Sequence, residues 1–332
     1  MDAAAVTSIW DAPFEVPPTV ADIRAAADRI AGWARRTPLL NAPLLDRIAG
    51  RRIWVKAECL QVTGSFKFRG AFAAISGLPA AQRDRGVLAF SSGNHAQGIA
   101  HAAALHGVPA VIVMPHDAPG VKVANTRAYG AEVVTYRRGS QDRDAVGAEL
   151  AAARGLTLIK PFDDARVIAG QGTCGLEIAA DLPEGVGEVL VCCGGGGLTS
   201  GVALALEGRV PVSPVEPEGY DDVARSLAAG RIERNDHETG GLCDAILTPA
   251  PGALTFDMMS RHCGPGVVVS DAEALRAMAL AWTHLRIVLE PGGAVALAAA
   301  LFRPGPTCVA VASGGNVDPA VFARALAEGG AD

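Results

Sequence analysis

Short apolar runs alternate with helical segments along almost the whole chain, and this alternation constrains the fold more than any other feature of the sequence. Runs that are apolar at every position are typical of strands buried on both faces of a parallel sheet, with helices as crossovers. We interpret as strands the runs 52–58, 87–90, 108–114, 132–136, 156–159, 189–193, 210–215, 267–270 and 308–312. Helical patterns occur at 19–35, 66–75, 94–106, 120–129, 142–154, 199–206, 221–229, 272–289, 293–301 and 319–327. The sequence therefore predicts an α/β fold with parallel sheets covered on both faces, and no regular element at 231–252.

Size and composition limit the class of protein further. The chain has 332 residues, of which 50% are apolar and 19% charged, so two lobes or one large α/β unit is expected and a disordered chain is excluded. A net charge of −6 argues against nucleic acid or an anionic membrane as partner. No run of about 20 apolar residues is present, and residues 1–11 do not resemble a signal peptide. Seven cysteines without ligand spacing favour reduced thiols, and hence a cytoplasmic protein.

Four consecutive glycines, Gly194–Gly197, follow a predicted strand and open the next helix. Their backbone N–H groups can converge on a phosphate, and the positive end of the helix dipole favours an anion there. A tight turn alone does not explain four glycines, because each of them costs chain entropy on folding. The alternative is a nicotinamide-dinucleotide loop with Glu216 as its acidic residue, although that loop requires a G-x-G-x-x-G spacing. The sequence thus predicts an anion-binding turn.

A second candidate is Lys67, which lies between Phe66 and Phe68 at the start of a predicted helix. The chain has only four lysines against 25 arginines, so a lysine in this sequence points to a need for a neutral amine, which arginine cannot supply. Apolar neighbours and a helix N-terminus both lower the pKa of an ammonium group, which suits a nucleophile. An ordinary surface lysine is the alternative, and we favour the functional interpretation.

Polar residues also follow two of the predicted strands. Residues 91–95 (Ser-Ser-Gly-Asn-His) and 313–316 (Ser-Gly-Gly-Asn) stand at carboxyl ends of strands, where open α/β sheets bind ligands. The hydroxyls, the carboxamide and the N–H groups of residues 91–95 can hold a carboxylate. His95 taken alone is better explained as a partly buried histidine with its hydrogen bonds satisfied.

Together these segments closely resemble the fold-type II pyridoxal-phosphate enzymes, in the branch of serine/threonine dehydratases and serine racemases. The resemblance covers residues 19–327. Its anchors are RTPL at 36–39, TGSFKFRGA at 63–71, SSGNHAQG at 91–98, AGQGT at 169–173, the glycines 194–197 and SGGN at 313–316. It implies two open parallel-sheet lobes with the cofactor in the cleft: a large lobe of residues 1–85 and 164–332, and a small lobe of residues 86–163.

The resemblance also implies a role for individual residues. Lys67 would carry pyridoxal phosphate covalently, and Phe66 would pack against the pyridine ring. The remaining cofactor contacts would come from Gly194, Gly195, Gly196, Gly197 and Leu198 at the phosphate, Asn94 at the phenolic oxygen and Ser313 at the ring nitrogen. The substrate carboxylate would be held by Ser91, Ser92, Asn94 and His95.

These roles favour an ammonia-lyase. A hydroxyl such as Ser313 opposite the ring nitrogen leaves the ring a weak electron sink, which favours prompt loss of a β-leaving group. Lys67 would take the α-proton, and a β-hydroxy amino acid of the serine, threonine or 3-hydroxyaspartate type would yield a 2-oxo acid and ammonia. Phe162 also favours a lyase, because the animal racemases usually have asparagine there. No regulatory domain follows Asp332 in this sequence, which favours a catabolic enzyme.

Three other functions remain open. The first is a serine- or aspartate-type racemase, in which Ser92 would reprotonate the opposite face. The second is a β-replacement synthase, which needs a second nucleophile. The third is a non-catalytic nucleotide-binding protein that uses the glycine turn alone.

Two further features concern binding. The resemblance implies a divalent cation (Mg²⁺, Mn²⁺ or Ca²⁺) on Glu216, Asp222 and the carbonyl of Tyr220, whose oxygens suit such ions. A solvated acidic helix start is the alternative.

In the resembling racemases the arginine aligned with Arg143 points toward the cleft, where a guanidinium can bind a second substrate carboxylate. A solvated basic loop is the alternative there. A homodimer is also expected.

Overall fold

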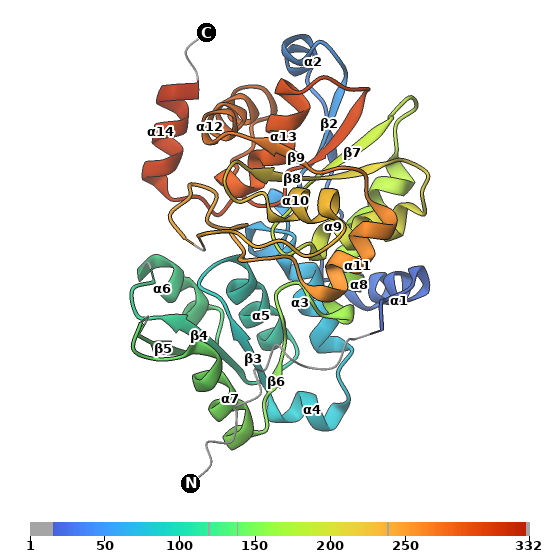
Figure 1. Cartoon of the computed structure of the whole chain (residues 1–332). Coiled ribbons are helices and arrows are strands. Elements are labelled where there is room, and N and C mark those ends of the chain that lie inside the picture. The colour runs from blue at the N-terminus through green and yellow to red at the C-terminus, as the bar shows by residue number, and fades with distance from the viewer. Residues whose placement is uncertain (1–15, 119, 138, 238, 330–332) are drawn as a thin grey trace.

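Two α/β lobes, each built on one open sheet, make up the protein (Figure 1). The computed structural model describes residues 16–118, 120–137, 139–237 and 239–329. The expectation about a signal peptide, and the first and last residues of the expected large lobe, lie outside this part of the chain. The α/β fold with parallel sheets is confirmed.

The six-stranded sheet has the order β1-β2-β10-β7-β8-β9 and is parallel except for β1, which pairs antiparallel with β2. Its strands are β1 Leu39–Leu40, β2 Ile53–Lys56, β7 Glu188–Cys192, β8 Val212–Pro217, β9 Val267–Val269 and β10 Cys308–Val311. The second sheet has the order β5-β4-β3-β6 and is parallel throughout. Its strands are β3 Val87–Phe90, β4 Ala110–Pro115, β5 Glu132–Tyr136 and β6 Thr157–Leu158.

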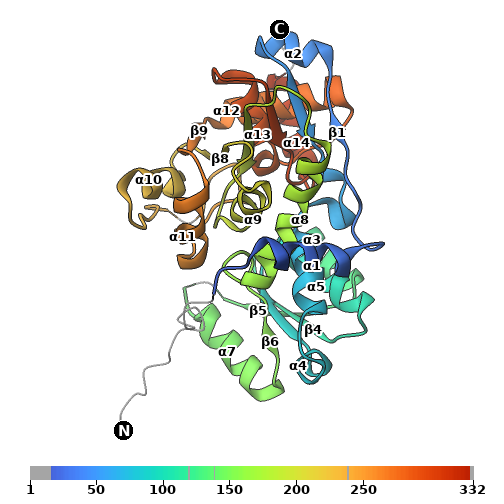
Figure 2. The ribbon, with the colours of Figure 1, turned by 90° about the vertical axis from the view of Figure 1, so that its right-hand side faces the viewer.

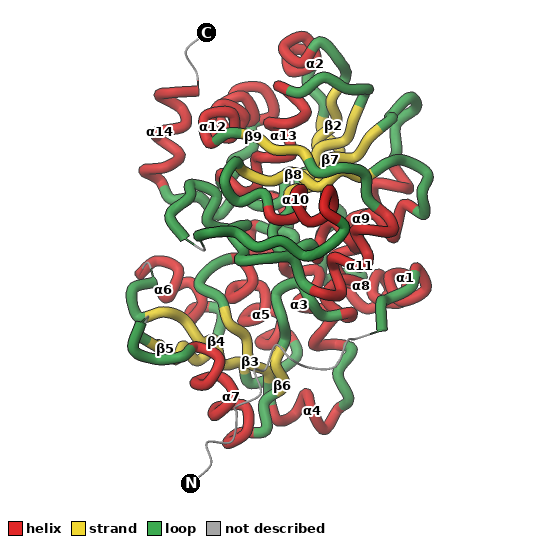
Figure 3. Tube along the Cα trace, in the orientation of Figure 1, coloured by secondary structure: helices red, strands yellow, loops and turns green. Residues whose placement is uncertain are grey.

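Helices cover both faces of these sheets (Figure 3). The first seven are α1 Val20–Ile30, α2 Pro43–Ala49, α3 Lys67–Ser76, α4 Ala80–Arg85, α5 Asn94–Leu105, α6 Gly120–Ala128 and α7 Arg143–Arg154. The others are α8 Ala165–Asp181, α9 Gly197–Leu206, α10 Asp222–Ala229, α11 Ala253–His262, α12 Asp271–Leu280, α13 Pro291–Phe302 and α14 Pro319–Gly329. Figures 1 and 2 place α1, α3 and α8 between the two sheets. None of the helices in the described residues combines the length and the apolarity that a membrane crossing requires.

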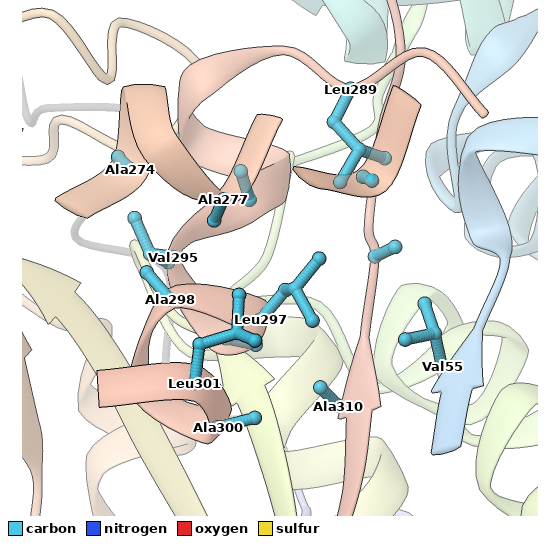
Figure 4. Packing of buried hydrophobic residues seen from close by; sticks show 14 of the residues in the cluster. Val55, Ala274, Ala277, Leu289, Val295, Leu297, Ala298, Ala300, Leu301 and Ala310 are labelled. Carbon is cyan, nitrogen blue, oxygen red and sulfur yellow. The ribbon is translucent and has the colours of Figure 1, made fainter. Parts of the chain in front are cut away.

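The six-stranded sheet is buried on both sides because alternate residues of its strands enter different cores. Val189 and Val191 of β7 pack into the cluster formed with α9, whereas Leu190 and Cys192 pack into the cluster formed with α13. The second cluster is made largely of alanine, valine and leucine from α12 and α13 (Figure 4). This double burial explains why the strands are apolar at every position.

The structure corrects the expectations at several helices, among them α2, α4 and α11, for which no helical pattern was identified. The helix expected over 272–289 ends at Leu280 and continues as a π-helical turn, Ala281–Leu285, after which Arg286 takes a positive φ of 61°. The 17-residue helix α8 was not expected, because its glycines obscure the helical pattern. A Cβ atom on Gly170 would lie 2.7 Å from the Arg69 carbonyl oxygen, so glycine is what allows α8 to pack this closely on α3.

Candidate active site

The carboxyl ends of β3, β7 and β10 meet at one cleft of 590 Å³. Its walls come from residues 90–95 after β3, residues 194–199 after β7 and Ser313 after β10, with Phe66 and Lys67 contributed by the start of α3. Parallel strands bring their carboxyl ends to the same edge of a sheet, which is why the segments after β7 and β10 meet here, and the segment after β3 of the other sheet completes the cleft. Most of the residues that we expected in the site therefore line one cavity: Phe66, Lys67, Ser91, Ser92, Asn94, His95, Gly194, Gly195, Gly196, Gly197, Leu198 and Ser313.

Lys67 is the first residue of α3, and its side chain extends into the cleft. Its Nζ donates a hydrogen bond to the Pro161 carbonyl oxygen at 2.8 Å and lies 5.0 Å from the centre of the Phe66 ring. Burial lowers the pKa of Lys67 to about 8, and the negative charge of Glu290 offsets part of this effect. The neutral fraction of the amine near neutral pH is therefore larger than that of an ordinary lysine, which favours its use as a nucleophile or a base.

A buried ionic network holds the start of α3 in place. Arg69, two residues after Lys67, is fully buried and donates to both oxygens of Glu58, at 2.8 Å each. It also donates to Glu177 of α8 at 2.8 Å, and Glu177 accepts from Lys56 of β2 at 2.5 Å. Two positive and two negative side chains thus neutralise one another and tie α3 to the sheet and to α8.

The four glycines shape a cradle that no larger residue could line. A Cβ atom on Gly195 would lie 2.3 Å from the Phe162 ring, and one on Gly194 would lie 2.8 Å from the Ile246 carbonyl oxygen. Gly196 has a φ of +91°, and Gly197 is the first residue of α9. Beside them, the buried Thr199 hydroxyl has no hydrogen-bond partner in the part of the chain that the structure describes, apart from the weak thiol of Cys193 next to it. The cradle lies at a helix N-terminus, and the Thr199 hydroxyl beside it is available for a further hydrogen bond. Both features fit a phosphate group.

The N-terminus of α5 forms a second polar corner of the cleft. Its N-cap, Gly93, offers no capping side chain, and the N–H of Gly93 donates to Ser91 Oγ at 3.1 Å. Burial lowers the pKa of His95 to about 3, and its Nε2 lies 3.0 Å from the Ile159 carbonyl oxygen. A carbonyl oxygen can only accept a hydrogen bond, so Nε2 must be the donor in this contact. The neutral imidazole of His95 therefore carries its proton on Nε2. The backbone N–H groups of α5, rather than a charge on His95, are thus what can attract a carboxylate.

Glu290 is a charged residue of the cleft that sequence reasoning missed. Its Oε1 accepts a hydrogen bond from Asn94 Nδ2 at 2.6 Å, and Asn94 Oδ1 accepts from Asn316 Nδ2 at 2.7 Å. Burial raises the pKa of Glu290 to about 7, against the lowering effect of the Asn94 hydrogen bond. The only signal for it was an acidic residue directly before Pro291 in an otherwise apolar segment. Glu290 fixes the orientation of the Asn94 amide toward the cleft.

Arg143 does not line the cleft. It begins α7, its Nε donates to Asp144 Oδ1 at 3.0 Å, and its guanidinium lies 5.3 Å from the centre of the Phe90 ring. Phe90 does line the cleft, so Arg143 contacts a lining residue without lining the cavity itself.

The expected cation ligands lie outside the cleft as well. Glu216 accepts hydrogen bonds from the N–H groups of Val223 at 3.0 Å and Ala224 at 2.7 Å, at the start of α10. Asp222 Oδ1 accepts from Asn235 Nδ2 at 2.5 Å, whereas Asp222 Oδ2 is buried and has no hydrogen-bond partner among the described residues. Burial raises the pKa of both carboxyls. No group of three or more His, Cys, Asp or Glu side chains in the described residues is arranged to hold a metal ion.

Known proteins resemble this chain over nearly its whole length. The chain is 43% identical over 313 residues to L-threo-3-hydroxyaspartate ammonia-lyase of Pseudomonas sp., which covers 92% of this chain and 97% of that protein. It is 38% identical over 320 residues to serine racemase of Schizosaccharomyces pombe, covering 94% and 98%. The solved structure of a threonine deaminase from T.th. superimposes with a TM-score of 0.84 at 44% identity, covering 91% and 99%. Residues 30–314 match the family described as pyridoxal-phosphate dependent enzyme. The chain therefore belongs to the family of pyridoxal-phosphate dependent enzymes.

Proposed function

We propose that this protein is an ammonia-lyase that converts a β-hydroxy amino acid into a 2-oxo acid and ammonia. The observation that carries the proposal is the meeting, in one cleft, of a buried lysine of lowered pKa and a side-chain-free cradle at a helix N-terminus. The similarity to an ammonia-lyase from Pseudomonas sp. and to a threonine deaminase supports it.

The residues of the cleft divide the work between them. Lys67 attaches the cofactor and then, as a free amine, removes the α-proton of the substrate. The cofactor supplies the electron-withdrawing ring that stabilises the electron pair left at the α-carbon. Phe66 would pack on the ring, Asn94 and Ser313 would bind its polar edges, and residues 194–198 would hold the phosphate, since all of them line the cleft.

Substrate positioning is the task of the α5 corner. Ser91, Ser92, Asn94 and His95 surround its open N-terminus, where backbone N–H groups favour the substrate carboxylate. Loss of the α-proton and of the β-hydroxyl, which leaves as water, produces an enamine. Addition of water to the enamine then releases ammonia and the 2-oxo acid, so that the net reaction consumes no water. Arg143 stays a prediction for substrate binding, since it contacts Phe90 of the cleft wall but does not line the cleft.

The decisive assay measures 2-oxo acid release from serine, threonine and 3-hydroxyaspartate, together with the visible absorbance of lysine-bound cofactor. Cofactor binding without release of 2-oxo acid from any of the three would refute the ammonia-lyase. A racemase is the second candidate, because Ser92 lines the cleft and the relative from Schizosaccharomyces pombe is a serine racemase. Chiral analysis of the remaining amino acid in the same reactions separates the two activities.

We further propose a divalent cation at the start of α10. The buried carboxylates of Glu216 and Asp222 lie close enough to raise the pKa of Glu216, and no cationic side chain among the described residues forms an ion pair with either of them. The orphaned Asp222 Oδ2 adds an acceptor without a donor. Together with the Tyr220 carbonyl, these oxygens suit Mg²⁺, Mn²⁺ or Ca²⁺. The role of such an ion is structural, since none of the three residues lines the cleft.

The arrangement of the chain supports three remaining proposals. The four-stranded sheet runs from Val87 to Leu158, which supports a small lobe of residues 86–163 and a large lobe of residues 1–85 and 164–332. All seven cysteines are free, which supports a reducing compartment such as the cytoplasm. Leu44 and Ile48 of α2 are 49% and 43% exposed, which supports a homodimer; light scattering in solution tests it.

A further inference from the structure

Only two cationic side chains of the described residues line the cleft, Lys67 and Lys122. No arginine of that part of the chain does so, and His95 carries a neutral ring. Lys67 is committed to the cofactor and to the α-proton. Lys122 is thus the remaining positive charge that a bound amino acid can meet.

Lys122 belongs to α6 of the four-stranded-sheet lobe, and its partner belongs to the other lobe. Its Nζ donates to Asp244 Oδ2 at 2.8 Å, and Asp244 lies on the long connection between α10 and α11, which faces α6 (Figure 1). Asp244 also lines the cleft, so the ion pair crosses its mouth. The charges of both residues act on the carboxyl of Glu290, as does the charge of Lys67, which places the pair in the same electrostatic environment as the reacting lysine.

This ion pair is suited to exchange. The side chain of Asp244 is 59% exposed and that of Lys122 is 27% exposed, and ion pairs with an exposed partner contribute little to stability. Asp244 can therefore turn into water at low cost. If another carboxylate takes its place, Lys122 keeps a charge-assisted hydrogen bond, and a negative charge is retained beside it.

We infer that Lys122 binds the side-chain carboxylate of a dicarboxylic β-hydroxy amino acid, and that Asp244 occupies the same position on Lys122 when no such substrate is bound. This inference rests on the proposed ammonia-lyase function and names its substrate class. It differs from the expectation for Arg143, which does not line the cleft. It also differs from a simple latch between the lobes, because breaking a latch affects all substrates alike.

The test compares kcat/KM for 3-hydroxyaspartate with kcat/KM for threonine in the holoenzyme. In Lys122→Met, the ratio of the two falls roughly 10- to 100-fold, the range expected when a hydrogen bond to a charged group is lost. In Asp244→Asn, the ratio rises, because the competing carboxylate is gone. Arg127→Ala, which removes an exposed charge from the same helix, is the matched control and leaves the ratio unchanged.

Several outcomes overturn the inference while leaving the ammonia-lyase intact. If Lys122→Met lowers kcat/KM equally for both substrates, the ion pair with Asp244 serves only to hold the two lobes together. A fall of the ratio in Arg143→Ala but not in Lys122→Met assigns the distal carboxylate to Arg143, and a parent enzyme that uses threonine but not 3-hydroxyaspartate excludes the substrate class. If no 2-oxo acid forms from any substrate, the proposed function fails. The thermal shift that 3-hydroxyaspartate causes in the holoenzyme then still tests Lys122, since the inference requires Lys122→Met to lose it.

Discussion

Replacing Arg69 by methionine tests whether the buried ionic network is what holds the reacting lysine in place. The guanidinium is fully buried and donates to Glu58, to Glu177 and to the Thr173 hydroxyl, whereas methionine fills a similar volume without any charge. Glu58 then stays buried with the Thr37 hydroxyl as its remaining hydrogen-bond donor. Removing one partner of a buried ion pair costs about 3–5 kcal/mol, because the other charge is left uncompensated.

This cost converts into a shift of the melting temperature. With roughly 2.1 cal/mol/K of unfolding entropy per residue, a chain of 332 residues loses about 1.4 °C for each kcal/mol. We therefore expect Arg69→Met to lower Tm by roughly 4–7 °C. Because Arg69 lies two residues after Lys67 on α3, the visible absorbance of lysine-bound cofactor should weaken as well, at cofactor concentrations that saturate the parent protein.

The matched control is Arg154→Met. Arg154 makes a two-pronged ion pair with Glu132, at 2.7 and 3.2 Å, but both side chains are largely exposed, so the shift in Tm should be small. Adding Glu58→Gln to Arg69→Met should restore part of the lost stability, because it removes the orphaned charge. A Tm for Arg69→Met no lower than that of Arg154→Met would refute the reasoning. So would an additive loss in the double variant.

Other variants probe the cleft and the proposed cation site. Lys67→Ala should abolish the visible cofactor band and turnover of every substrate, and retained turnover would exclude Lys67 as the reacting lysine. Ser92→Ala should abolish any racemisation but spare part of the elimination, as measured by chiral analysis and 2-oxo acid release; equal loss of both would reduce Ser92 to a positioning role. Because the pKa of Glu290 is raised to about 7 from 4.5, the folded state holds its proton more tightly and the free energy of unfolding should fall as pH rises from about 4.5 to 7. Urea titrations should show this fall in the parent and a flatter profile in Glu290→Gln, whereas identical profiles would contradict the raised pKa. A chelator should lower Tm, with recovery on added Mg²⁺ or Mn²⁺. Glu216→Ala should lower Tm by the same amount without chelator. If neither the chelator nor the substitution changes Tm, Glu216 serves only as a helix cap.

The strands were predictable because their burial leaves a direct mark on the sequence. All nine runs interpreted as strands overlap a strand of the structure, and β3 and β5 have the expected bounds. The capping box at the start of α1, formed by Thr19 and Asp22, is equally visible in the sequence, because its two residues lie only three positions apart. Helix α8 was not, since its glycines are dictated by its neighbours α3 and α9 and weaken its own pattern. The residue types of such an element reflect contacts that lie far away in sequence.

The residues of the site likewise divide into those that the sequence could identify and those that only the structure revealed. Lys67, Gly194–Gly197 and Ser313 could be identified from the sequence, because each stands in a local motif: a lysine between aromatic residues, a glycine turn and a polar strand end. Local motifs specify chemistry within one strand–turn–helix unit, where a few neighbouring residues decide the backbone path. The sequence by itself thus determined the α/β class, the family and most of the segments that line the cleft.

Only the tertiary structure decided which of these segments meet and what charge each side chain carries. The contact of Glu290 with Asn94 spans 196 residues, and the ion pair of Lys122 with Asp244 spans 122. No periodicity or motif links positions so far apart. The lowered pKa of Lys67 and the raised pKa of Glu290 depend on burial between the lobes, and burial is a property of the packed chain.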